Sequence, residues 1–102
     1  MFRSALIAAP WLAIAAALPA LADSTEAYCR LSRHNHTAPV EQSRCQFSQR
    51  QGNVTVDMGS RWAFRFDSED EGRSYTRDNL ADGIRFSREG EYTLSVFWAP
   101  PQ

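Results

Sequence analysis

The sequence predicts an all-β fold: a small antiparallel meander, as a curled sheet or small barrel, of about six or more short strands. Apolar and polar residues alternate with period two, turn residues recur at intervals of roughly 8 to 12 residues, and no window has helical periodicity. The exported part, about 80 residues, is small enough that such strands must curl over one shared aromatic core.

Six segments show the alternation in turn. The first three place apolar residues on one face and are separated by a polar loop and by a turn at 51–52. After a second turn at 59–60 the alternation resumes, a polar and acidic stretch at 67–83 predicts a long loop with at most one helical turn, and two strands follow around a turn at 89–90. Their inward residues are Ala27, Cys29 and Leu31; Cys45 and Phe47; Val54, Val56 and Met58; Trp62, Phe64 and Phe66; Ile84 and Phe86; Tyr92, Leu94, Val96 and Trp98.

The first 22 residues have the pattern of a secretory signal peptide. A short start containing Arg3 precedes an apolar run rich in alanine and leucine, and Ala20-Leu21-Ala22 is a cleavage site of the A-x-A type. The sequence therefore predicts residues 1–22 as a signal peptide and 23–102 as a single small β domain. We expect a periplasmic or secreted protein that has no membrane span after cleavage.

Composition excludes some classes of partner. Eleven arginines face twelve acidic residues, and the chain has no lysine. This slightly acidic balance argues against nucleic acid as a partner. The chain also predicts no cofactor, because one small domain leaves no room for a second lobe to enclose one.

The two cysteines, Cys29 and Cys45, both lie in the part predicted to be exported. An oxidising compartment favours a disulfide between them. Closing a loop of about 15 residues stabilises a domain by roughly 3 kcal/mol in the chain-entropy model. No C-x-x-C pattern points to a redox-active pair.

Two segments offer weak metal-binding patterns. His34 and His36 form an H-x-H pair that would supply two ligands if the segment is extended, although no further ligand is indicated. The acidic loop 67–71, with Gly72 and Asp78, resembles a degenerate calcium loop, but glutamate is too long for its inner positions. Solvated histidines and a solvated acidic loop explain both patterns, so no metal site is predicted.

The sequence predicts no enzyme. Its exposed neighbouring acids have no evident reason for shifted pKa values, and no motif presents a serine or cysteine nucleophile. Arginines beside aromatic residues, such as Arg61 and Arg65, belong to the outward face of a strand. Phe97 also falls on the outward face of the last strand, where it is either an exposed anchor or covered by the N-terminal segment.

From Glu71 to about residue 96 the chain resembles the periplasmic and membrane-bound inhibitors of c-type lysozyme. That family has a Ser-Gly-x-x-Tyr loop, an aromatic strand, and a basic-Gly turn followed by an acid. The corresponding stretches here are Glu71-Gly72-Arg73-Ser74-Tyr75, Gly83-Ile84-Arg85-Phe86 and Ser87-Arg88-Glu89-Gly90-Glu91.

The resemblance implies an eight-stranded antiparallel barrel whose loop around Glu71, Gly72 and Tyr75, with Arg88 at the neighbouring turn, inserts into a lysozyme cleft. Three features depart from the family. Glu71 replaces the loop serine, the basic turn residue is displaced by one position to Arg88, and the two cysteines are close in sequence. The sequence thus predicts a small exported protein-binding domain, as a lysozyme inhibitor or, alternatively, as an envelope-associated structural or accessory domain without catalytic activity.

Overall fold

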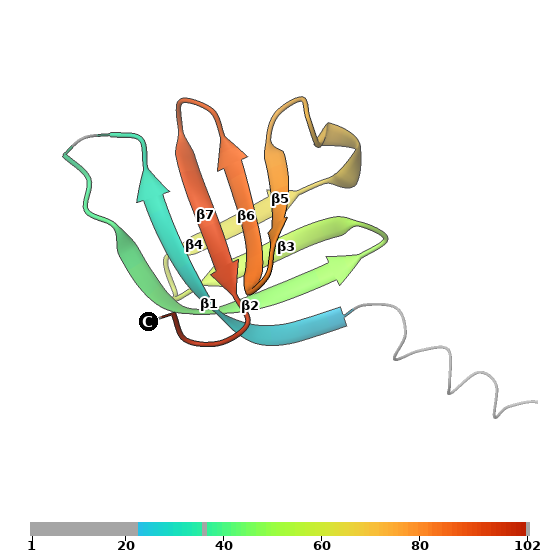
Figure 1. The fold of residues 1–102 in the computed structure, drawn as a ribbon, viewed down its shortest axis with the longest axis horizontal. Coiled ribbons are helices and arrows are strands. Elements are labelled where there is room, and N and C mark those ends of the chain that lie inside the picture. Colours follow the sequence, from blue (N-terminus) through green and yellow to red (C-terminus); the bar gives the residue numbers. More distant parts are fainter. Residues whose placement is uncertain (1–22, 36, 102) are drawn as a thin grey trace, which may run out of the picture.

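The computed structural model describes residues 23–35 and 37–101. The predicted signal peptide and His36 lie outside these residues. The described chain forms one sheet of seven antiparallel strands in the order β4-β3-β2-β1-β7-β6-β5 (Figure 1). The strands are β1 (Asp23–Arg33), β2 (Glu41–Arg50), β3 (Asn53–Met58), β4 (Trp62–Phe66), β5 (Thr76–Leu80), β6 (Gly83–Arg88) and β7 (Tyr92–Phe97).

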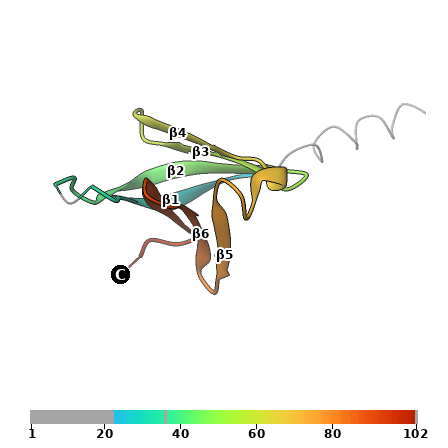
Figure 2. The ribbon, with the colours of Figure 1, turned by 90° about the horizontal axis from the view of Figure 1, so that it is seen from above.

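The sheet curls into a half-barrel, which confirms the predicted all-β fold. Figure 2 shows β3 and β4 on one side of the curl and β5 and β6 on the other. No strand pairing joins β4 to β5 within the described residues, so the sheet stays open where the family resemblance implied a closed, eight-stranded barrel. A twisted sheet of seven strands with large side chains on one face curls to bury that face.

The core fills the concave face of the sheet. Phe66 on β4 and Phe86 on β6 stack across the curl, with ring centroids 4.2 Å apart, and both side chains are fully buried. From Ala27 to Val96, the residues predicted to face inward are at most 9% exposed. The exceptions are Trp62 and Tyr92, whose rings are half-buried. The period-two pattern therefore identified the core correctly.

The disulfide forms as predicted. Cys29 and Cys45 are joined on neighbouring strands, with Cα atoms 5.8 Å apart, and both are buried. They are diagonal neighbours on one face, two residues off the direct register, since Cys29 faces Ser43 and Cys45 faces Ala27. The bond ties β1 to β2 at the base of the loop that connects them.

One strand was missed by the sequence prediction. Residues 67–83 were expected to form a loop, but they contain β5 after a 3₁₀ turn (η3, Ser68–Asp70). The inward position of β5 opposite Phe86 is occupied by Arg77, whose guanidinium lies 5.7 Å from that ring and donates to Gln49 Oε1 at 3.0 Å. An arginine whose guanidinium lies over an aromatic ring gives no apolar alternation, so the strand has no period-two signal.

The end of the last strand also differs from prediction. Trp98 was placed on the inward face, but β7 ends at Phe97 and Trp98 is 44% exposed. Its backbone N–H donates to Asp82 O at 3.1 Å, and its ring packs edge-on against Phe47 at 5.2 Å. Trp98 therefore covers one end of the core from outside the sheet.

The outward face of the sheet carries the aromatic residues Phe97 and Tyr28. Phe97 is half-buried, faces Tyr28 across the strands, and has the Arg30 guanidinium 5.5 Å above its ring. The Arg30 guanidinium on the neighbouring strand therefore covers the Phe97 ring through a cation–π contact. The outward position predicted for Arg61 and Arg65 is confirmed, since both are exposed. In the described chain no helix has the length and apolar character needed to cross a membrane.

Candidate functional site at the rim

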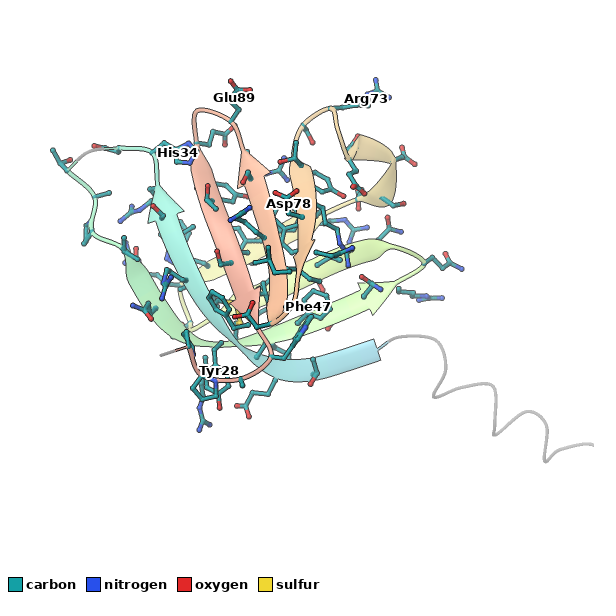
Figure 3. The ribbon with its side chains drawn as sticks, viewed as in Figure 1. Tyr28, His34, Phe47, Arg73, Asp78 and Glu89 are labelled. Carbon is teal, nitrogen blue, oxygen red and sulfur yellow. A yellow bond between two sulfur atoms is a disulfide. The ribbon has the colours of Figure 1, made fainter. Side chains whose placement is uncertain are left out.

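Three segments that are distant in sequence meet at one rim of the half-barrel. They are the loop between β4 and β5, the β6–β7 turn, and the end of β1, and Figure 3 shows Arg73, Glu89 and His34 at this rim. Between them lies an open groove of about 440 Å³, which we call the rim groove. Its lining consists of His34, Gly72, Arg73, Ser74, Tyr75, Thr76, Ser87, Glu89 and Thr93.

Tyr75 anchors the β4–β5 loop in the core. Its side chain is only 4% exposed, and its ring packs against Phe66 at 5.1 Å. The hydroxyl donates to Asp67 O at 2.8 Å, so one residue ties the end of the loop to its beginning. Burial raises the pKa of the Tyr75 hydroxyl, and the nearby Glu71 carboxylate raises it further.

The turn inside this loop depends on Gly72. Its N–H donates to Tyr75 O at 2.6 Å, and its φ of +82° lies in the left-handed region that glycine adopts without strain. The four residues before Tyr75, which we call the tip (residues 71–74), are all exposed. The buried tyrosine thus fixes a short segment that faces solvent.

Arg88 connects the tip to the sheet. Its Nη1 donates to Ser74 O at 3.3 Å and to Ser74 Oγ at 3.2 Å, and its Nη2 donates to Arg65 O on the edge strand β4 at 2.9 Å. Its Nε donates to the Tyr92 hydroxyl at 2.9 Å. Because these donors are occupied within the fold, Arg88 positions the tip, and the guanidinium that faces solvent there is Arg73.

The two aromatic rings under Arg88 complete this arrangement. The guanidinium carbon lies 5.1 Å from the Phe66 ring and 5.7 Å from the Tyr75 ring. Burial raises the pKa of the Tyr92 hydroxyl, while the hydrogen bond from Arg88 acts in the opposite direction. A planar cation with five N–H donors suits such a junction of carbonyls, a hydroxyl and ring faces.

The structure thus brings together the four residues that the sequence singled out, in two different roles. Glu71 and Gly72 lie in the exposed tip, whereas Tyr75 and Arg88 hold it from below. Sequence reasoning did not single out Arg73, which is exposed in the tip and lines the rim groove. The only available signal was its position between a turn glycine and a tyrosine, in a stretch without alternation.

The two weak metal-binding patterns both adjoin the rim groove. His34 is exposed, with Nε2 3.1 Å from Thr93 Oγ1, and its predicted companion His36 is outside the described residues. In the acidic loop, the Asp67 carboxylate lies 2.8 Å from Arg65 Nε. Across residues 23–35 and 37–101, no three His, Cys, Asp or Glu side chains are grouped to hold a metal ion.

Comparisons of the chain with protein-family models, with curated proteins and with solved structures find no match. The resemblance to lysozyme inhibitors therefore rests on the quoted residues alone and stays a prediction.

Proposed function

We propose that this protein is a non-catalytic protein-binding domain that inhibits a c-type lysozyme by inserting the tip into the enzyme's cleft. The observation that carries the proposal is the construction of the rim. An exposed four-residue segment is fixed in place by the buried ring of Tyr75 and by the three-way contacts of Arg88. A segment ordered before binding loses less conformational entropy when it inserts into a partner.

The chemistry of the tip fits a cleft that contains carboxylates. Arg73 is exposed and presents a guanidinium, which forms strong bidentate hydrogen bonds with a carboxylate. The Arg88 donors are used within the fold, so Arg73 is the cation that we assign to the enzyme's acids. Glu71 carries the same sign of charge as those acids, and we place it against a basic residue at the margin of the cleft.

The acidic loop supports encounter with a basic enzyme. Glu69 and Glu71 are exposed, and Asp70 is half-exposed, on the segment that leads to the tip. Such a surface attracts a positively charged partner at long range and raises the association rate. Added salt is expected to slow association much more than it speeds dissociation.

The test is calorimetry of the disulfide-bonded protein with a c-type lysozyme, beside an assay of lysis. We expect saturable binding that blocks lysis, and an affinity at least about tenfold weaker for Arg73→Gln. Arg50→Gln is the matched control, because Arg50 is an exposed arginine at the end of β2 that does not line the rim groove. Absence of binding at about 100 µM lysozyme, which corresponds to roughly −5.5 kcal/mol, would contradict the proposal.

A further inference from the structure

A second groove lies on the outward face of the sheet, beside the β2–β3 turn. It has a volume of about 430 Å³, within the range of roughly 300–1,000 Å³ found for small-ligand sites. We call it the hairpin groove. It is lined by Ser48, Gln49, Arg50, Gln51, Asn53, Thr55 and Arg65, and it shares no lining residue with the rim groove.

Strand register explains why these polar groups converge. Ser48 faces Thr55, and Thr55 faces Arg65, so one row across β2, β3 and β4 points outward. The β2–β3 turn closes the end of this row. It places Gln51 in the left-handed backbone conformation, with φ +54°, which residues other than glycine, asparagine and aspartate rarely adopt.

The charge of the hairpin groove is opposite to that of the whole protein. Two guanidiniums line it without a lining carboxylate, whereas the full chain has a formal net charge of −1. Asp67 Oδ1 lies 2.8 Å from Arg65 Nε, beside the groove. Within the part of the chain that the structure describes, Arg50 forms no ion pair.

The remaining lining groups indicate what surrounds the anion. Three amide side chains and two hydroxyls line the groove. The amide oxygens of Gln49 and Asn53 accept from Arg77 Nη1 at 3.0 Å and from the Ser68 N–H at 2.8 Å, so these two residues offer a ligand chiefly their NH2 donors. Sugar hydroxyls need partners of this kind. No aromatic ring lines the groove to stack on a neutral sugar face, so the charged group of the ligand has to supply most of the affinity.

From this arrangement we propose that the hairpin groove binds an anionic sugar, whose phosphate or carboxylate lies between Arg50 and Arg65 and whose hydroxyls contact the amide groups. The site is independent of the tip and of lysozyme binding. The groove is open, so the expected affinity is modest, with a dissociation constant of about 1 mM. Because both arginines are exposed, binding is expected to weaken at high ionic strength.

The test is a titration followed by NMR shifts of the amides of residues 48–55 and 65, at low salt. Glucose 6-phosphate and glucuronate represent the two sources of the anion, glucose is the neutral sugar, and inorganic phosphate is the anion without a sugar. We expect at least one anionic sugar to bind more tightly than both glucose and phosphate. Equal binding of glucose, or of phosphate alone, would overturn the assignment, as would no shift at about 10 mM of either anionic sugar.

Variants separate this site from the rest of the surface. Arg50→Gln and Arg65→Gln are each expected to lower the affinity for the anionic sugar by about tenfold, equivalent to about 1.4 kcal/mol. Arg85→Gln, which removes an exposed arginine from the outward face of β6, is expected to change nothing. Arg73→Gln is also expected to leave sugar binding intact, so this proposal and the lysozyme proposal fail independently. An equal loss in the Arg85→Gln protein would show a nonspecific charge effect and contradict the site.

Discussion

The two long loops of the half-barrel are stabilised in different ways. The loop between β1 and β2 is closed at its base by the Cys29–Cys45 disulfide, while its own residues bury little, and Val40 is 53% exposed. The loop between β4 and β5 has no covalent closure and is held by the buried ring of Tyr75 and by Arg88. The disulfide lowers the conformational entropy of the unfolded chain, whereas the contacts of Tyr75 and Arg88 set the conformation of the folded tip.

Only the β4–β5 loop is held in a fixed conformation by core residues, so it is the loop better suited to present a binding surface. Local hydrogen bonds within the β1–β2 loop involve Asn35, which accepts from Thr37 and from Ala38, and they leave the loop outside the core. In the β4–β5 loop, the ring of Tyr75 at one end lies in the core, and its hydroxyl donates to Asp67 O at the other end. Substitutions in the two loops should therefore affect stability and binding in different proportions.

The largest effect is expected for Tyr75→Ala. Removing a buried aromatic ring costs roughly 3–5 kcal/mol, comparable to the whole stability of a small domain, and the tip loses its anchor. Urea unfolding monitored by tryptophan fluorescence measures this change. Tyr75→Phe keeps the ring and removes only the hydrogen bond to Asp67 O, so it should lose about 1 kcal/mol and retain binding. A fully stable Tyr75→Ala protein would show that Tyr75 does not anchor the loop.

The disulfide gives the next largest effect. Replacing Cys29 and Cys45 together with alanine should lower the free energy of unfolding by about 3 kcal/mol, the entropy of a closed loop of about 15 residues. Denaturant titration of both proteins measures the difference. At concentrations where the variant is still folded, its affinity for lysozyme should equal that of the parent. Weakened binding by the folded variant would place the β1–β2 loop in the contact surface.

Arg88→Met should separate stability from binding. Methionine keeps part of the apolar contact with Phe66, but the hydrogen bonds to Arg65 O and Ser74 are lost. Since Arg88 is partly exposed, we expect a loss of only about 1–2 kcal/mol in stability. The affinity for lysozyme should fall by about tenfold or more, because the tip is no longer fixed. Calorimetry gives the affinity and denaturant titration of the same preparation gives the free energy of unfolding. An unchanged affinity would show that Arg88 does not position the tip.

The smallest effect is a decline of stability at alkaline pH. The pKa values of Tyr75 and Tyr92 are raised above the ordinary value of 10.0, chiefly by burial. Above about pH 10 the unfolded chain therefore loses these protons before the folded protein does, and the free energy of unfolding falls; below that pH neither group contributes a slope. Urea titrations at about pH 9 and about pH 11 test this, and Tyr75→Phe should reduce the decline. An equally steep decline in that variant would exclude Tyr75 as a source.

Sequence patterns predicted the strands whose inward residues are apolar, and failed where a charged side chain faces inward. The Arg77 guanidinium lies over the Phe86 ring, so β5 has no apolar alternation. The rim was predictable only in part. Gly72 and Tyr75 were identified by resemblance, but the contacts of Arg88 with Arg65 and Ser74 depend on how strongly the sheet curls. No local pattern specifies that curvature, because it results from packing between strands that are distant in sequence.

Hydrogen exchange of the protein with and without a c-type lysozyme tests most directly whether the tip is the binding surface. We expect slower exchange at residues 71–74 and at the adjoining β6–β7 turn, with no change in the β1–β2 loop or at the hairpin groove. Protection confined to the β1–β2 loop, or no protection at saturating lysozyme, would contradict the assignment of the tip as the binding surface.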